Sequence, residues 1–310
     1  MTHLTTISGA GLTRFAFGAM QFGSKADATA SRALFDACRE AGIRHFDTAH
    51  AYTDGASETL LGQCVAADRD ELFVATKAGY IGGSSRGNIL QSFDESRQRL
   101  NMDQVDLFYL HRFDPNTPLE ETFETLAELQ RADKIRFIGV SNFAAWQVMK
   151  AQSIAAKLGT RIDVIQPMYN LVKRQAEVEI LPMCASEGIL PVPYSPLGGG
   201  LLTGKYATGG SGRLSEDSRY GARYGQPAMH EAAVQLVDLA QEIGADPATL
   251  AVAWVAYHRA KPVPILSARS VAQLRPSLDG IRFPMDEALY ARLSSLSATP
   301  PPATDRLEEA

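Results

Sequence analysis

The chain has 310 residues, of which 45% are hydrophobic and 21% are charged, a composition typical of a folded globular protein. Its formal net charge is −5 and no run of basic residues stands out, which argues against a nucleic-acid-binding surface. Small-molecule chemistry is therefore the first class of function to consider.

The cysteines and the N-terminus indicate the compartment. Cys38, Cys64 and Cys184 are far apart within apolar helical patterns, so we expect reduced core residues and neither disulfides nor a thiolate metal site. The N-terminus has no basic region followed by an apolar block, and no window reaches the roughly 18 apolar residues of a membrane span. We expect a cytoplasmic protein with no contact to membranes.

Apolar strands alternate with amphipathic helices along the chain. The strands are expected at residues 12–18, 43–47, 72–76, 105–110, 135–140, 162–166, 189–193 and about 263–266. Helical spacing lies at 27–41, around 60–65, around 90–100, from Pro118, and at 143–157, 174–187, 229–243 and 247–260. A long glycine-rich loop at about 198–227 precedes the last two of these helices.

Eight such units without a break in composition predict a closed (β/α)8 TIM barrel, a single domain over residues 1–310 with a flexible tail from about 299. The alternative is a doubly wound open sheet. The nucleotide-binding pattern GxGxxG of that fold is absent, because Gly9 and Gly11 are followed by Arg14.

In a TIM barrel the active site lies at the C-terminal ends of the strands. Strands two, three and four end in Asp47, Lys77 and His111, and Tyr52 follows Asp47 closely. The next three strand ends carry further polar residues, namely Ser141, Asn142, Gln166, Tyr194 and Ser195. We expect these side chains to converge on one small volume and to form a catalytic site.

The charges of these residues suggest proton transfer to a carbonyl group. Lys77 beside Asp47 would form a buried ion pair, and a cation near Tyr52 would lower the pKa of its phenol, so that it donates a proton at neutral pH. A neutral His111 would orient the carbonyl. Taken singly, each residue also fits a structural role, as a turn former, a surface lysine, a core histidine or loop packing.

Several segments resemble the aldo-keto reductase superfamily over nearly the whole chain. They are FDTAHAY with GASETLLG, VATKAG, DLFYLHRFD, IRFIGVSNF, QPMYN, VPYSPLGGGLLTGKY and ILSARSVAQL, in the order of that family. The resemblance implies a catalytic tetrad of Asp47, Tyr52, Lys77 and His111, with Tyr52 as general acid in reduction and base in oxidation. It also implies hydride transfer between a nicotinamide cofactor and a small carbonyl or alcohol substrate.

The resemblance further implies a set of cofactor-binding residues. Ser141, Asn142 and Gln166 would hold the nicotinamide carboxamide, Tyr194 would stack on its ring, and Met20 and Asp47 would lie beside it. Ser195, Leu197, Gly199 and Lys205 would follow the pyrophosphate, and Ser267, Arg269 and Gln273 would meet the adenosine end.

Two positions depart from the family pattern. The chain has Ser267-Ala268-Arg269 where Gly-Ala-Arg is frequent, and Pro276-Ser277 where an acidic residue and an asparagine are common. Because the planar Arg269 cation suits a 2′-phosphate, we expect NADP(H) to be favoured over NAD(H). Stacking of Arg269 on adenine without discrimination is the alternative.

Other features leave alternatives open. Residues 83–87 match the GxSxG nucleophile elbow, but Ser85 lies in a loop well beyond its strand, and the histidines show no metal-ligand spacing. His45 and His258 are interpreted as structural, and His50 as a pocket residue or loop packing.

Arg112 would recognise a polar or anionic substrate, or be a solvated or ion-paired charge. The 198–227 loop, with Arg213, Arg219, Tyr220, Arg223 and Tyr224, would fold over the cofactor. A rival function is a nicotinamide-binding regulatory subunit with little turnover.

Overall fold

The computed structural model describes residues 3–206, 209–306 and 308. In this part of the chain eight parallel strands form one sheet in the order β7-β6-β5-β4-β3-β2-β1-β8. Their bounds are β1 (Ala16–Gly18), β2 (His45–Asp47), β3 (Phe73–Ala78), β4 (Val105–Leu110), β5 (Ile135–Ser141), β6 (Val164–Gln166), β7 (Leu190–Pro191) and β8 (Ile265–Leu266). Two backbone hydrogen bonds join its edges, from Val263 to Pro191 and from Ile265 to Pro193, each 2.9 Å long. The sheet is thus closed into the predicted (β/α)8 barrel.

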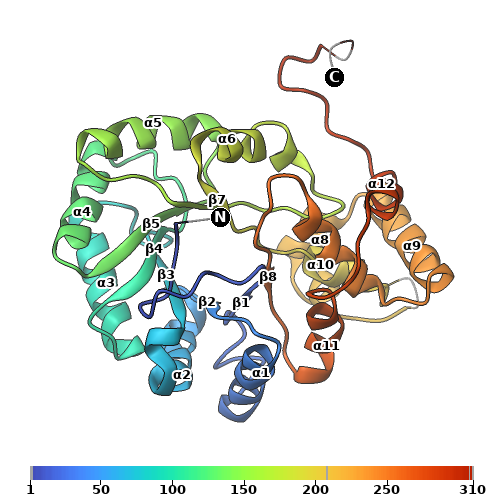
Figure 1. Ribbon diagram of the computed structural model, residues 1–310, viewed down its shortest axis with the longest axis horizontal. Helices are drawn as coiled ribbons and strands as arrows, with labels where there is room; N and C mark the ends of the chain where they lie inside the picture. Colours follow the sequence, from blue (N-terminus) through green and yellow to red (C-terminus); the bar gives the residue numbers. More distant parts are fainter. Residues whose placement is uncertain (1–2, 207–208, 307, 309–310) are drawn as a thin grey trace.

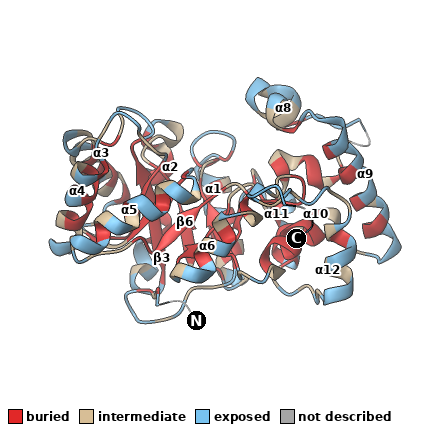
Figure 2. Cartoon of the chain, turned by 90° about the horizontal axis from the view of Figure 1, so that it is seen from above, coloured by how far each residue is buried: buried red, intermediate tan, exposed pale blue. Residues whose placement is uncertain are grey.

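Helices cover the outside of the barrel (Figure 1). They are α1 (Ala28–Glu40), α2 (Ala56–Val65), α3 (Arg86–Leu100), α4 (Leu119–Arg131), α5 (Ala145–Lys157), α6 (Ile180–Glu187), α9 (Pro227–Glu242), α10 (Pro247–Tyr257), α11 (Val271–Asp279) and α12 (Glu287–Ser294). Prolines begin α9 and α10, where the missing N–H costs nothing. Figure 2 shows the helices buried on the side that faces the strands and exposed on the other.

Alternate strand residues fill the barrel interior, because successive side chains of a strand point to opposite faces. The interior cluster comprises Leu4, Ala16, Phe73, Ala75, Leu107, Tyr109, Val164, Leu190, Val192, Val263 and Ile265. Gly139 of β5 makes room for one of them, since a Cβ there would lie 2.4 Å from Cδ1 of Tyr109. Small and large side chains in the barrel interior are therefore closely matched, and a larger residue at one position would overlap with its neighbour.

The N-terminal segment closes the end of the barrel where the strands begin. Leu4 is fully buried in the interior cluster. The Arg136 guanidinium of β5 donates to the Thr5 carbonyl at 2.8 Å, and Thr5 forms an antiparallel bridge with Gly11. Figure 2 shows the N-terminus on the lower side of the molecule and α8 (Ser218–Tyr224) on the upper side. We call the upper end, formed by the C-terminal ends of the strands, the mouth.

The predicted strands and helices occur in the structure, but several are shorter than predicted, for example β1, which begins at Ala16, and α6, which begins at Ile180, and other differences follow. Lys77 lies inside β3 rather than beyond it. The 198–227 loop contains short helices, η4 (Gly198–Thr203), α7 (Arg213–Glu216) and α8. Helices α11 and α12 follow the last strand and were not among the predicted elements. Glycine-rich or short amphipathic segments carry too little periodicity to reveal such elements.

Other parts of the chain bear on the remaining predictions. Cys38, Cys64 and Cys184 are free and buried, as predicted. In the described ranges no helix is long and apolar enough to cross a membrane. Residues 299–302 of the tail line a cavity of about 710 Å³ beside Tyr257 and Tyr290, away from the mouth. Flexibility of the tail stays a prediction.

Candidate active site

Lys77 and Asp47 form a buried ion pair at the mouth. Both side chains are almost inaccessible, and the Lys77 ammonium donates to the Asp47 carboxylate and, at 2.7 Å, to the Thr48 carbonyl. The Gln166 amide donates to the other Asp47 oxygen at 2.9 Å. Both carboxylate oxygens are thus bonded, and β2, β3 and β6 are tied together at their C-terminal ends.

Tyr52 and His111 lie directly against this pair. The Lys77 Nζ is 5.1 Å from the centroid of the Tyr52 ring. The Tyr52 and His111 rings meet edge to face, with centroids 5.6 Å apart. The structure therefore brings together Asp47, Tyr52, Lys77 and His111, the four residues of the predicted tetrad.

Burial controls the ionisation of the pair. It raises the pKa of Asp47 and lowers that of Lys77, and the contact between the two groups opposes both shifts. Each charge is therefore kept mainly by its partner. Loss of one partner would leave the other uncompensated in a site without solvent.

The expectation that Lys77 lowers the pKa of Tyr52 is wrong for this arrangement. The pKa of the Tyr52 phenol is raised well above its usual value, first by burial and then by the Asp47 charge and the neighbouring Tyr220 and Tyr80. Lys77 gives its proton donors to Asp47 and Thr48 and presents its charge to the tyrosine ring. Tyr52 is therefore held as the neutral phenol, the form that can donate a proton.

His111 is neutral, as expected. Burial, followed by the charges of Lys77 and Arg112, lowers its pKa to about 3. Its backbone is fixed on both sides, because its N–H donates to the Ala78 carbonyl at 2.8 Å and its carbonyl accepts from the Asn142 amide at 2.9 Å. A neutral, fixed imidazole is suited to orienting an uncharged polar group.

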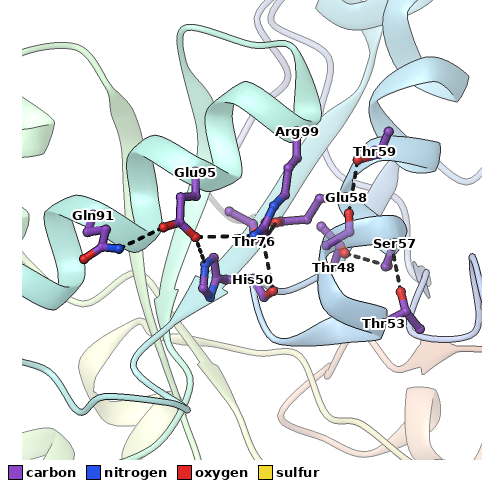
Figure 3. A network of polar contacts seen from close by, with 11 residues as sticks. Thr48, His50, Thr53, Ser57, Glu58, Thr59, Thr76, Gln91, Glu95 and Arg99 are labelled. Atoms are coloured by element: carbon purple, nitrogen blue, oxygen red, sulfur yellow. Dashed lines mark hydrogen bonds and ion pairs between the residues drawn. The ribbon is translucent and has the colours of Figure 1, made fainter.

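The loop that carries Tyr52 is anchored by a network behind it (Figure 3). Glu58 at the start of α2 is fully buried, accepts from the Thr76 hydroxyl at 2.6 Å and pairs with Arg99 of α3 at 3.2 Å. Arg99 also donates to the His50 carbonyl at 3.3 Å. His50 in turn contacts Glu95 at 2.7 Å, which favours loop packing over a pocket position for this histidine.

The same loop takes an unusual backbone path. Thr53, Asp54 and Gly55 have φ values of 48°, 51° and 89°, in the left-handed region. The φ of Gly55 favours glycine for the turn, and a Cβ there would lie 2.5 Å from Arg99 Nε and displace this side chain. The Thr53 hydroxyl offsets part of this strain by accepting from the Ser57 N–H at 2.9 Å.

A second group of predicted residues continues from the tetrad. The Ser141 hydroxyl donates to the Gln166 carbonyl at 2.9 Å, and the Asn142 amide donates to the Ser141 hydroxyl at 3.1 Å. The Tyr194 hydroxyl donates to Asn142 Oδ1 at 2.8 Å, and burial raises its pKa to about 12. Hydroxyl, amide and aromatic groups thus line one wall beside Asp47.

The residues expected along a pyrophosphate lie on the next segment. The Gly198 N–H donates to the Ser195 carbonyl at 2.9 Å, which starts η4 directly after Leu197. Gly199 has a φ of 66°, and a Cβ there would be 2.8 Å from the Tyr220 ring of α8. Lys205 follows η4, with its Nζ 4.8 Å from the centroid of the Tyr206 ring. Residues 207 and 208 of the predicted loop lie outside the described residues.

The residues expected at the adenosine end form a third group. The Arg269 N–H donates to Gln273 Oε1 at 2.8 Å, and the Arg269 guanidinium pairs with Glu216 of α7 at 3.4 Å. Ser267 is exposed just before them. Ser277 is buried within α11, so this departure from the family pattern does not face solvent. Met20 follows Ala19, whose N–H donates to the Asp47 carbonyl at 2.8 Å, which places it at the mouth.

The 198–227 segment is held down by Asn170, which the sequence analysis did not single out. The Asn170 amide donates to the Ser195 carbonyl at 2.9 Å and to the Tyr224 hydroxyl at 3.2 Å. Tyr224 is fully buried, and Tyr220 lies between the Arg213 and Arg223 guanidinium groups, 4.8 and 5.1 Å from its centroid. The quoted segment QPMYN, which ends in this asparagine, was the available signal. Tyr80, whose ring lies tilted against His111 with centroids 4.9 Å apart, was also missed.

The other motifs receive structural roles. Ser85 is the residue before α3 and has no strand-to-helix turn of the nucleophile-elbow kind. His45 is fully buried in the barrel interior, and neither of its ring nitrogens has a partner among the described residues. His258 accepts from the Ala260 N–H at 3.1 Å in the turn after α10.

The chain is similar to a known protein family and to several known proteins. The model of the aldo/keto reductase family matches residues 14–298. The uncharacterized oxidoreductase YrpG of Bacillus subtilis is 30% identical over 94% of each chain. A probable voltage-gated potassium channel subunit beta of Oryza sativa subsp. japonica is 34% identical over 80% of this chain and 81% of its own. Aflatoxin B1 aldehyde reductase member 2 of Rattus norvegicus is 37% identical over 61% of this chain and 53% of its own. The matched range contains all eight strands and the four residues of the predicted tetrad.

Proposed function

The chain belongs to the aldo/keto reductase family, and from this premise we propose that it is an NADP(H)-dependent oxidoreductase that interconverts an aldehyde or ketone with the corresponding alcohol. The observation that supports this most is the buried Lys77–Asp47 pair beneath the neutral side chains of Tyr52 and His111. Such a pair is expensive to bury and is expected at a site that moves a proton.

In the reduction direction Tyr52 is the proton donor. His111, neutral and fixed, donates a hydrogen bond to the carbonyl oxygen and orients it toward the Tyr52 hydroxyl. As the carbonyl carbon accepts a hydride, its oxygen takes the phenolic proton and becomes the alcohol hydroxyl. The tyrosinate that remains is stabilised by the Lys77 ammonium until it regains a proton from solvent, and oxidation follows the same steps in reverse.

The donor set beside the tetrad fits a nicotinamide dinucleotide. Ser141, Asn142 and Gln166 offer the hydroxyl and amide groups that a carboxamide requires, and Tyr194 offers a flat ring beside them. Lys205 and Arg269 are the cations that would hold the phosphates. When bound, the reduced cofactor supplies the hydride. Because Arg269 is already paired with a carboxylate, we propose that it takes a 2′-phosphate in place of Glu216.

The test is turnover by the purified protein and by Tyr52→Phe. We expect NADPH to be oxidised with a generic aldehyde such as nitrobenzaldehyde, and Tyr52→Phe to lower kcat by about a hundredfold to ten-thousandfold. Cofactor affinity, measured by quenching of protein fluorescence, should stay within about twofold because the ring is kept. Retained turnover in Tyr52→Phe would refute the assigned proton donor.

A second candidate is a cofactor-binding regulatory subunit, favoured by the similarity to the potassium channel subunit beta. A regulatory subunit and an oxidoreductase share the requirement for cofactor binding and differ in turnover. Tight NADPH binding with no oxidation across a broad carbonyl panel, measured in both directions, would favour the regulatory subunit.

A further inference from the structure

A row of rings leads from the tetrad to the surface of the mouth. The His111 ring contacts the Tyr52 ring edge to face and the Tyr80 ring in a tilted arrangement, with centroids 5.6 Å and 4.9 Å apart. The Arg112 guanidinium lies over the Tyr80 ring, 4.9 Å from its centroid. His111 is buried, whereas Tyr80 and Arg112 are exposed. Arg112 therefore stands one ring further out than the group proposed to orient the carbonyl.

Among the residues that the structure describes, no carboxylate forms an ion pair with Arg112. Asp114 is close enough to respond to its charge. The Asp114 oxygens, however, accept from the Ser84 N–H, the Asn116 N–H and the Thr117 hydroxyl at 2.7 to 2.9 Å, so this carboxylate shapes its own loop.

Stacking places the guanidinium without using its hydrogen-bond donors. The guanidinium carbon of Arg112 lies over the Tyr80 ring, and in the described part of the chain its N–H groups donate to no protein acceptor, so they are free to bind the oxygens of a carboxylate or phosphate. An arginine whose only role is solvation does not need a ring to hold its guanidinium in place. The short backbone around it is also fixed, through the His111 hydrogen bonds to Ala78 and Asn142.

Neighbouring charges strengthen the positive potential at this side of the mouth. Arg219 of α8 acts on the same Tyr80 ring, although Asp217 pairs with it at 2.8 Å. Arg223 of α8 stacks on Tyr220, which contributes to the raised pKa of Tyr52 and so lies near it. An anion entering the mouth would meet these cations before it reaches the tetrad.

From this geometry we propose that Arg112 binds an anionic group, a carboxylate or a phosphate, at the far end of a short carbonyl substrate, and that it sets the preference of the enzyme for anionic over neutral aldehydes. The proposal rests on the proposed reductase function and adds the chemical class of its substrate. Tyr80 is a positioning residue, because it contacts the Arg112 guanidinium and acts on the substrate only through Arg112.

The experiment compares aldehydes that differ by one charge. Glutaric semialdehyde is paired with pentanal, and glycolaldehyde phosphate with glycolaldehyde, and kcat/KM is measured with NADPH for the intact protein and three variants. Arg112→Met removes the charge at nearly constant length, and Arg112→Lys keeps it without the planar fork. Arg86→Met is the control, since Arg86 pairs with Glu128 of α4 at the outer surface.

We expect the unaltered protein to prefer the anionic member of at least one pair by roughly tenfold or more, as a charged hydrogen bond allows. The pair that shows the preference identifies carboxylate or phosphate. Arg112→Met should remove the preference mainly through KM, Arg112→Lys should keep part of it, and Arg86→Met should keep all of it. The preference should also decline as salt is raised.

Two results would contradict the role of Arg112, and a third result would contradict the reductase function on which that role depends. Equal kcat/KM within both pairs, or a preference that persists in Arg112→Met, contradicts the role of Arg112 while leaving the reductase function intact. A protein that oxidises NADPH with none of the four aldehydes and none of the broad carbonyl panel refutes the reductase function itself, and the substrate class with it.

Discussion

Replacing Glu58 by Gln tests whether the network of Figure 3 positions Tyr52. The change keeps the shape and the bond to Thr76 but removes the charge that faces Arg99, and it sets an amide against the guanidinium. Hydrogen bonds to charged groups contribute roughly 1.5–3 kcal/mol, and the 29% exposure of Arg99 allows water to weaken this one. We therefore expect a loss of about 2 kcal/mol in unfolding free energy.

The same change should reduce turnover, because the Arg99 bond to the His50 carbonyl holds the chain two residues before Tyr52. Small displacements of a proton donor are costly, and we expect kcat to fall by roughly tenfold to a hundredfold with cofactor affinity unchanged. Urea unfolding measures the first effect, and steady-state kinetics with fluorescence titration of NADPH measures the second.

Glu95→Gln is the matched control. Glu95 contacts the same Arg99, at 3.3 Å, but its side chain is 37% exposed, so its removal should cost less in both assays. A Glu58→Gln protein with the stability and kcat of the unaltered chain would refute the network. A loss of stability with unchanged kcat would show that Glu58 supports the core and not the position of Tyr52.

Three further changes probe the interior and the cofactor site. Gly139→Ala should lower the unfolding free energy by roughly 1–3 kcal/mol, because its Cβ would overlap with Tyr109. A urea-unfolding curve equal to that of the unaltered chain would contradict the close packing. Burial lowers the pKa of His45 from 6.5 to about 3, so the unfolded chain binds the extra proton between these values and stability falls as pH drops through this window. Between pH 7 and pH 5 this histidine should lower the unfolding free energy by about 2 kcal/mol. The His45→Leu protein should lose less stability over the same range, and an equal loss would show that His45 is solvated in the folded protein. Arg269→Gln should weaken NADPH binding by roughly tenfold and NADH binding little, and an unchanged ratio of the two Kd values would remove the basis for NADP(H) preference.

The strands and the tetrad were accessible from the sequence because both depend on short-range patterns. A buried parallel strand reads as an apolar run, and the residue at its end is fixed by the same run, so Asp47, Lys77 and His111 could be placed at one mouth. The family motifs added the residues near Asp47. Their roles in catalysis and cofactor binding stay proposals for experiment.

Long-range burial was not accessible in this way. Glu58 lies within a segment of helical spacing, and only the packing of α2 on α3 shows it buried against Arg99. The direction of the Tyr52 pKa shift is set first by burial of the phenol and then by the Asp47 charge, and neither can be read from a short stretch of sequence. Helix α8 is set by Asn170 and Tyr224, which are far apart in the chain.

Leu4 and the Thr5–Gly11 bridge close the lower end of a barrel whose interior is filled by side chains. Under the proposed function, substrate, product and the proton that Tyr52 regains must therefore all pass through the mouth. Reprotonation of Tyr52 would then follow the release of product, so the architecture would set the order of these two steps.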